Sequence, residues 1–232
     1  QLLTERYPGS RKTDEMEGMK IIRLGGRLTL HLYAPYFVKR HSHEYDIIID
    51  DIAHAVPFWS PFFTKKPVIA IIHHVHQQVI DIEVRPGLRY LIKAAERTIR
   101  HTYKYIVTVS QTTKEHLIKQ LGIPPSRIKV IYPGIDHDKY RPGKKSEIPT
   151  ILWLGRMKRY KNVDHVIEAF KIVKEEIENA KLILIGKGEH ERNIRRIIEK
   201  DRIKDVHLMG WVPECVKVKM LQEAWCIVST SK

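Results

Sequence analysis

Apolar and polar positions follow two recurring patterns along this chain: short apolar runs of strand length, and longer stretches with apolar residues three or four positions apart. Six short runs come first, and each predicts a buried parallel strand. They lie at 2–4, 21–24, 46–50, 68–72, 105–109 and 129–133. Amphipathic stretches at 86–101 and 111–120 predict helices between the last three runs. The first part of the chain is therefore expected to be an α/β layer of βαβ units.

A polar segment interrupts the alternation before it resumes. Residues 143–149 are charged, contain Pro and Gly and show no periodicity, which predicts an exposed linker between domains over 1–142 and 150–232. The second part predicts strands at 150–155, 181–186, 206–210 and 226–229, and helices at 163–178, 191–199 and up to 224. Asn162 precedes the first of these helices and is expected to cap it. Two open sheets of this kind imply a cleft between them.

Composition limits the class of protein without choosing a function. The hydrophobic fraction of 43% is enough for packed cores, and no apolar run reaches the roughly 18 residues of a membrane span. The first residues lack the layout of a signal peptide, so we expect a cytoplasmic protein. Cys215 and Cys226 lie in apolar surroundings and are expected to be reduced core thiols. The net charge of +14 predicts attraction to phosphates, whether on nucleic acid, anionic lipid or a nucleotide.

One basic loop combines charge with a favourable place in an α/β sheet. Arg156, Lys158, Arg159 and Lys161 lie between a buried strand that ends at Gly155 and the helix that follows. Ligands of open α/β sheets bind at the carboxyl edge of the strands. Cations beside a helix N-terminus suit a diphosphate. The alternative is an ordinary solvated basic loop.

A second candidate is the histidine run after the strand at 68–72. His73, His74 and His76 fall within four residues, which suggests a zinc site, but the chain offers no evident fourth ligand at the usual wider spacing. We therefore expect no metal ion. Gly186 and Gly188 end a later strand and would let backbone approach a ligand, although the third glycine of a dinucleotide fingerprint is absent. A tight turn alone is the alternative for these glycines.

Several segments resemble the sequence signatures of one enzyme family. They are IIHHVH at 71–76, VTVSQTTKEHL at 107–117, IKVIYPGIDHDKYRP at 128–142, GRMKRYKN at 155–162, LILIGKGEH at 182–190 and VHLMGWVPE at 206–214. In this order and spacing they resemble family-4 (group 1) retaining glycosyltransferases of GT-B fold, over nearly the whole chain. The resemblance implies two Rossmann-like domains that face across a cleft, the first for the acceptor and the second for the donor.

The implied reaction moves a hexosyl group from a nucleoside-diphosphate sugar to a saccharide or lipid-linked acceptor, without a cofactor. The resemblance assigns Arg156 and Lys161 to the donor diphosphate, where they would offset charge on the leaving group without a metal. It places His73 near the reacting sugar. The nucleotide contacts that it implies are Gly186, Gly188, Gly210, Trp211 and Val212. Positions near the cleft and hinge are Ser110, Gly134 and Asp136, for which turn and capping roles are also expected.

The sequence departs from the family pattern at four places. Pro133 stands where the family has Asn, and Asn162 where it has Gly. The family's pair of glutamates, eight positions apart, would begin just beyond Lys232, and its glycine-rich turn would precede Gln1. From these two absences we expect a chain cut at both ends, with an incomplete second domain and no activity by itself.

A cationic ridge is expected on the helix after Pro86. Arg85, Arg89, Lys93 and Arg97 recur every four residues and would face anionic lipid at the inner surface of a membrane. A solvated helix face is the alternative. Two other functional classes stay open: a non-catalytic nucleotide-binding or scaffold module, and a nucleic-acid-binding protein, against which the dispersed charge and the lack of a recognised motif argue.

Overall fold

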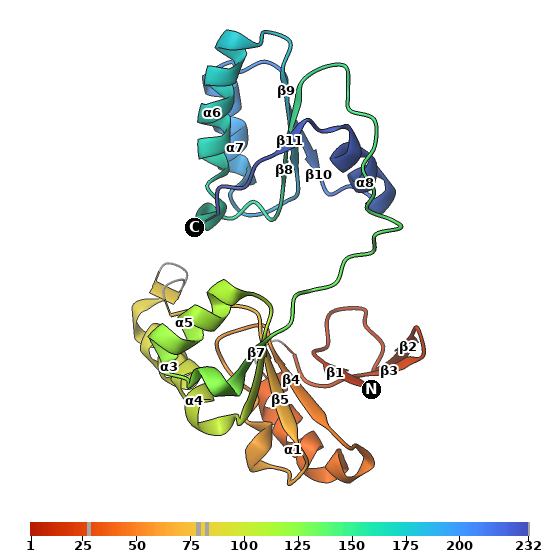
Figure 1. Ribbon diagram of the computed structural model, residues 1–232, viewed down its shortest axis with the longest axis vertical. Coiled ribbons are helices and arrows are strands. Elements are labelled where there is room, and N and C mark those ends of the chain that lie inside the picture. The colour runs from red at the N-terminus through yellow and green to blue at the C-terminus, as the bar shows by residue number, and fades with distance from the viewer. Residues whose placement is uncertain (27–28, 78–79, 82–83, 232) are drawn as a thin grey trace. The chain divides into compact units, whose positions relative to one another are not determined.

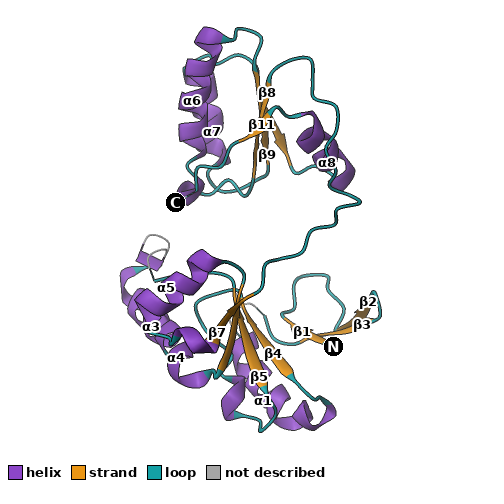
Figure 2. Cartoon of the chain, viewed as in Figure 1, coloured by secondary structure: helices purple, strands orange, loops and turns teal. Residues whose placement is uncertain are grey.

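The computed structural model describes residues 1–26, 29–77, 80–81 and 84–231. The chain forms two compact units, Gln1–Gly134 and Ile135–Lys232. Each unit contains a four-stranded parallel sheet with helices beside it (Figures 1 and 2). The predicted α/β class with two Rossmann-like domains is therefore confirmed.

The main sheet of the N-terminal unit has the order β4-β5-β6-β7, and all its neighbours are parallel. Its strands are β4 (Ile48–Ile52), β5 (Val68–Ile72), β6 (Tyr105–Thr108) and β7 (Ile128–Val130). Val68, Ala70 and Ile72 are buried on one face of β5, and Ile69 and Ile71 are half-buried on the other, which explains why the strand reads as a continuous apolar run. Ile52, Ile72 and Thr108 pair in register, so these three strands end at the same edge.

Helices precede and connect the strands of this sheet along the chain. They are α1 (Leu30–His41), α3 (Pro86–Arg97), α4 (Ile99–Thr102) and α5 (Gln111–Leu121), with single 3₁₀ turns η1 (Ser42–Glu44), η2 (Ser60–Phe62) and η3 (Pro125–Arg127). The single helix predicted over 86–101 is divided at Thr98, whose hydroxyl donates to the carbonyl of Ala95. Helix α1 was not expected from the sequence.

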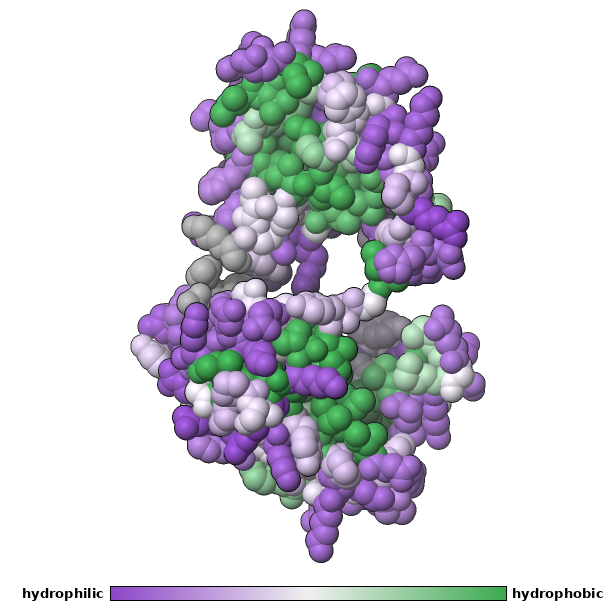
Figure 3. Space-filling model, in the orientation of Figure 1, coloured by the Kyte–Doolittle hydropathy of each residue, from purple (hydrophilic) through white to green (hydrophobic). Residues whose placement is uncertain are grey.

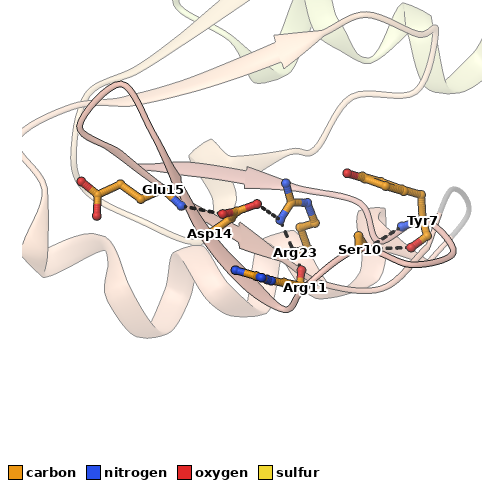
Figure 4. A network of polar contacts seen from close by, with 6 residues as sticks. All are labelled: Tyr7, Ser10, Arg11, Asp14, Glu15 and Arg23. Atoms are coloured by element: carbon orange, nitrogen blue, oxygen red, sulfur yellow. Dashed lines mark hydrogen bonds and ion pairs between the residues drawn. The ribbon is translucent and has the colours of Figure 1, made fainter.

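The first residues form a separate three-stranded sheet, of order β1-β3-β2. Strand β1 (Leu2–Thr4) runs parallel to β3 (Met19–Arg23), and β2 (Thr13–Met16) pairs antiparallel with β3. Arg23 fixes the loop before β2, because its guanidinium lies 3.3 Å from the Arg11 carbonyl and 3.4 Å from Asp14 Oδ2 (Figure 4). The predicted buried strand at 2–4 is wrong in its burial, since this small sheet leaves Leu2 exposed.

The sheet of the C-terminal unit has the order β10-β9-β8-β11, again parallel throughout. Its strands are β8 (Thr150–Leu154), β9 (Lys181–Ile185), β10 (Val206–Gly210) and β11 (Cys226–Ile227). Helices α6 (Val163–Glu176) and α7 (Glu191–Lys200) lie on one face and α8 (Glu214–Glu223) on the other (Figure 1). Phe170, Leu182 and Ile194, each at most 1% exposed, join α6, β9 and α7 in one core.

Four further predicted features differ from the structure. Strand β4 lies two residues later than the predicted 46–50 and includes two aspartates. Strand β7 ends at Val130, and Ile131 and Tyr132 are exposed. Strand β11 is only two residues long and exposed. The cysteines are free but both are exposed, so the prediction of core thiols is wrong: Cys215 and Cys226 lie on a helix and an edge strand that present them outward.

The segment 143–149 is attached to the C-terminal unit. Ser146 N–H donates to the carbonyl of Glu223, and the Trp225 indole N–H donates to the carbonyl of Ser146. Glu214, at the start of α8, accepts bonds from Lys217 on the same helix and from Tyr140 and Lys139, which lie just before the segment. These bonds lower the pKa of Glu214 to about 2. Residues 135–149 therefore lie against α8 and β11, and the compact units divide at Gly134.

Candidate functional site

The basic loop after β8 is fastened to the neighbouring loop after β9. Gly155 N–H donates to the carbonyl of Ile185, and Met157 N–H to that of Lys187, both over 3.0 Å. The Met157 side chain is fully buried and anchors the loop in the core. Arg156 is exposed and Lys161 half-buried, so the anchored loop presents both cations beside the N-terminus of α6. Arg159 is also exposed, and Lys161 Nζ lies 5.2 Å from the centre of the Tyr160 ring.

Asn162 precedes α6 but its side chain makes no capping hydrogen bond. The prediction of an Asn cap is wrong, because this residue has a left-handed backbone, with φ of 46°, and its amide reaches the carbonyl of Thr230 instead. The left-handed region is open to Gly and tolerated by Asn. This conformation explains physically why Asn stands where the family has Gly.

The two glycines after β9 allow the loops after β8 and β9 to approach each other. A Cβ added at Gly186 would lie 1.8 Å from the Gly155 carbonyl oxygen, and one at Gly188 would lie 2.3 Å from that of Met157. Gly186 also has a φ of 133°, which side chains rarely adopt. Backbone of this chain, at Gly155 and Met157, therefore packs where a side chain would lie. Both glycines hold the basic loop in place.

The predicted nucleotide contacts of β10 lie at the same edge of the sheet. Gly210 has a φ of 65°, and its carbonyl accepts from Gly186 N–H over 2.7 Å. Trp211 is 75% exposed, and Val212 packs against the small core beside α8. The exposed indole is therefore free of the core and provides a flat apolar surface beside the glycines. In the C-terminal unit the structure thus brings together the predicted diphosphate and nucleotide residues.

His73 follows β5 in the N-terminal unit and is held at two points. Its Nε2 lies 2.7 Å from Asp51 Oδ1, and its carbonyl accepts from the Thr113 hydroxyl over 3.2 Å. Sequence reasoning missed both partners. Asp51 carried a signal that was available, since it lies at the end of the adjacent strand β4 and so at the same edge as His73.

The loop after His73 is held by a buried carboxylate. Glu96 is 2% exposed and accepts from the backbone N–H of His76 over 2.7 Å and from the Gln77 amide over 2.6 Å. This contact joins α3 to the histidine run. Residues 78–79, which follow, lie outside the described part of the chain.

The residues predicted for the cleft and hinge make local turns. Ser110 caps α5, because its hydroxyl accepts from Thr113 N–H over 3.1 Å. Asp136 Oδ1 accepts from the backbone N–H of Asp138 and of Lys139, over 3.0 and 3.1 Å. Gly134 is exposed, and a Cβ there would meet nothing within 4 Å. Turn and capping roles therefore account for the contacts of Ser110 and Asp136.

The expected cationic ridge on α3 is partly neutralised. Lys93 Nζ lies 2.6 Å from Asp81 Oδ2, which lowers the pKa of Asp81, and Arg89 bonds the Tyr90 hydroxyl. Arg85 and Arg97 are exposed. The same helix also carries three exposed apolar side chains: Leu88, Tyr90 and Leu91 are 53%, 65% and 69% exposed. On the face drawn in Figure 3, apolar surface is interspersed with polar surface in both units.

Two kinds of feature are absent from the described residues. Among them, no group of three His, Cys, Asp or Glu side chains is placed to hold a metal ion. No helix within the described ranges is long and apolar enough to span a bilayer.

Comparison with known proteins gives matches along the chain. The model of Glycosyltransferase Family 4 matches residues 3–139, and that of Glycosyl transferases group 1 matches residues 135–232. A curated relative is the UDP-Gal:alpha-D-GlcNAc-diphosphoundecaprenol alpha-1,3-galactosyltransferase of Escherichia coli, 24% identical over 180 residues. That match covers 68% of this chain but 46% of the relative, so the chain spans less than half of its length.

Solved structures share the fold at low sequence identity. WaaG, a glycosyltransferase involved in lipopolysaccharide biosynthesis, is similar with a TM-score of 0.69 at 17% identity, over 94% of this chain and 64% of its own. Anabaena HepE, solved in complex with UDP and glucose, gives 0.68 at 16% identity, over 92% of this chain and 61% of its own. The fold is that of GT-B glycosyltransferases.

Proposed function

Because the chain belongs to glycosyltransferase family 4, we propose that it transfers a hexosyl group from a nucleoside-diphosphate sugar to a saccharide or lipid-linked acceptor. The observation that carries the proposal is the anchored basic loop, which presents Arg156 and Lys161 at the carboxyl edge of the sheet, beside the N-terminus of α6. The galactosyltransferase relative uses a UDP sugar and a lipid diphosphate by name, and HepE binds UDP and glucose.

The proposal assigns a different chemical role to each unit. In the C-terminal unit, Arg156 and Lys161 would bind the diphosphate and offset the negative charge that grows on it as the bond to the sugar breaks, with no metal ion in that role. Trp211 offers the flat apolar surface that a nucleotide base needs, and Gly186 and Gly210, which bond to each other, hold the loops around it. In the N-terminal unit, His73 would contact the reacting sugar, with its ring oriented by Asp51. Retention of the anomeric configuration is part of the proposal through the family resemblance.

The test is nucleoside-diphosphate binding by the full chain and by two variants. Arg156→Ala and Lys161→Ala are each expected to weaken binding of UDP, GDP or ADP, whichever the protein prefers, by about 10- to 100-fold, since a hydrogen bond to a charged group contributes about 1.5–3 kcal/mol. Calorimetry measures the affinity. Arg159→Ala is the matched control, a neighbouring exposed arginine that should leave affinity within about twofold. Unchanged affinity in both site variants would contradict the assignment, and turnover of nucleotide-sugar donors separates an enzyme from a scaffold.

Peripheral membrane attachment is a second proposed property, favoured by the exposed apolar side chains of α3. Leu88 and Leu91 lie one turn apart on α3, with Arg85 one turn before Leu88, and they form the apolar and cationic surface that suits the headgroup region of an anionic bilayer. A lipid-linked acceptor would bring the enzyme to such a surface. Lys93 contributes less, because Asp81 neutralises it.

Vesicle flotation tests this attachment. The double change Leu88→Ser and Leu91→Ser is expected to lower the bound fraction on anionic vesicles severalfold, because burial of each leucine contributes about 1.5–3 kcal/mol. Ile172→Ser, an equally exposed residue on α6, is the control and should bind as the wild type. Equal binding by the leucine variant, or binding to neutral vesicles as strong as to anionic ones, argues against the α3 surface. Retention on DNA in place of vesicles would instead support nucleic-acid binding.

A further inference from the structure

The chain that follows β11 runs past the end of β8 and reaches the basic loop. Val228 N–H donates to the carbonyl of Leu152 over 2.9 Å, which continues the parallel pairing beyond the strand itself. Thr230 then meets the far end of the loop. Its hydroxyl lies 2.8 Å from the carbonyl oxygen of Lys161 and 2.9 Å from that of Asn162. Its own carbonyl accepts from the Asn162 side-chain amide over 3.0 Å.

These contacts fix the backbone conformation at Asn162. Asn162 has a φ of 46°, in the left-handed region that glycine adopts readily and that Asn tolerates as a single residue. The Thr230 hydroxyl shares its one hydrogen between the two carbonyls that the turn brings side by side. The Asn162 side-chain amide donates to the carbonyl of Thr230. Thr230 is thus bonded to the carbonyls of two successive residues, Lys161 and Asn162, and to the Asn162 side chain.

The loop is therefore fastened at both ends by different strands. At its front, Gly155 and Met157 bond to the chain at the end of β9. At its back, where Lys161 lies, the bonds come from the continuation of β11. A cation on a flexible loop loses entropy when it binds, and a backbone that is already fixed reduces that loss.

We propose that Thr230 is a positioning residue of the donor site, which fixes the Lys161 backbone so that its ammonium group meets the diphosphate. The proposal rests on the proposed function, because it assigns Lys161 to the diphosphate. Thr230 acts through Lys161 and does not itself touch the ligand. Its loss should therefore affect binding of the phosphates and leave binding of the nucleoside unchanged.

The matched variants are Thr230→Val, which keeps the shape and removes the hydroxyl, and Thr230→Ser, which keeps the hydroxyl. Thr230→Val is expected to weaken nucleoside-diphosphate binding by roughly five- to tenfold, with Thr230→Ser within about twofold of the wild type. The affinity for the nucleoside alone should not change. In a Lys161→Ala background the valine change should have no further effect, because the residues act as one unit. Hydrogen exchange at the amides of 159–165 should be faster in the valine variant and normal in the serine variant.

The outcomes distinguish a failure of the proposed function from a failure of the role assigned to Thr230. If the wild type binds no nucleoside diphosphate, the proposed function is rejected, and a donor-site role for Thr230 with it. If the wild type binds and Thr230→Val binds equally well, only the role of Thr230 is rejected. Unchanged hydrogen exchange in Thr230→Val would show that the hydroxyl does not hold the loop. An effect that persists in full when Lys161 is absent would show that Thr230 acts on the unit as a whole.

Discussion

Replacing Gly186 with alanine is expected to destabilise the C-terminal unit by about 3 kcal/mol or more, one of the largest effects that a single methyl group can have here. The added Cβ would lie 1.8 Å from the Gly155 carbonyl oxygen, at a φ of 133° that alanine rarely adopts. Relief of this overlap between the added Cβ and the carbonyl oxygen would require the loops after β8 and β9 to separate. That movement breaks the bonds from Gly155 N–H to Ile185 and from Met157 N–H to Lys187.

Denaturant unfolding, followed by hydrogen exchange in peptides from each unit, measures this effect. Loss of protection is expected in β8, β9 and β10, with the N-terminal unit unchanged. Gly87→Ala is the control, because a Cβ at Gly87 meets nothing within 4 Å and lies in the first turn of α3, where alanine is a good helix former. Stability of Gly186→Ala within about 1 kcal/mol of the wild type would contradict the close approach described for these loops.

The same glycine links the fold to the proposed chemistry. Arg156 lies between Gly155 and Met157, the two residues whose backbone packs against Gly186 and Gly188. Any separation of the loops moves the Arg156 backbone with them. Loss of diphosphate binding in a glycine variant would therefore come from displaced cations and not from a lost ligand contact, which is why the test of function uses Arg156 and Lys161 directly.

The elements that the sequence predicted well are those buried on both faces or along one clear stripe. Strands β5, β8 and β9 are continuous apolar runs because helices or loops cover both faces. Helix α6 is amphipathic, and it begins at the predicted Val163. Their bounds depend on local pattern, which a single sequence contains.

The elements that were missed depend on contacts distant in sequence. Helix α1 has exposed Leu32, Tyr33 and Tyr36 and an internal Pro35, so its pattern is not that of an amphipathic helix. Strand β2 is polar and exposed throughout, and it exists through its pairing with β3. In the site, the chemical character of Arg156 and Lys161 was readable from spacing. Thr230, which bonds the Lys161 carbonyl, was not, because it lies 69 residues further along the chain. Asp51, the partner of His73, was missed although its place at the end of the adjacent strand was a usable signal.

Asp50 is the other position where one side chain is expected to decide the stability of a unit. It lies inside β4 and is 4% exposed. Its carboxylate accepts from the Ser60 hydroxyl and from the Tyr103 hydroxyl, both over 2.6 Å, and from Ser60 N–H over 3.3 Å. Ser60 and Tyr103 are each 1% exposed, so water cannot replace the acceptor. Asp50→Ala would leave buried donors unpaired and should destabilise the N-terminal unit by about 3 kcal/mol or more.

The neighbouring residue provides the control for this change. Asp51 has a side chain that is 62% exposed and pairs with His73 at the surface, so Asp51→Ala should alter stability by about 1 kcal/mol at most. Tyr103→Phe removes one donor to Asp50 and the acceptor of Trp59 N–H. It should lower the free energy of unfolding by about 1–3 kcal/mol, between the effects of the two aspartate changes. Hydrogen exchange in the strands β4, β5 and β6 shows whether the lost stability belongs to the N-terminal unit. Equal stability of Asp50→Ala and Asp51→Ala would contradict the buried network.

The pH dependence of stability tests the same carboxylate independently. Burial raises the pKa of Asp50, and the bonds from Ser60 and Tyr103 offset only part of that shift. The folded unit therefore binds this proton more readily than the unfolded chain. The stability that Asp50 contributes should fall as the pH rises from its ordinary pKa, near about 3.9, through the raised value, and then stay level. Asp50→Asn lacks the titrating group, so the difference in unfolding free energy between the wild type and this variant should decrease over that range. A difference that increases with pH would mean that the hydrogen bonds to the carboxylate outweigh its burial.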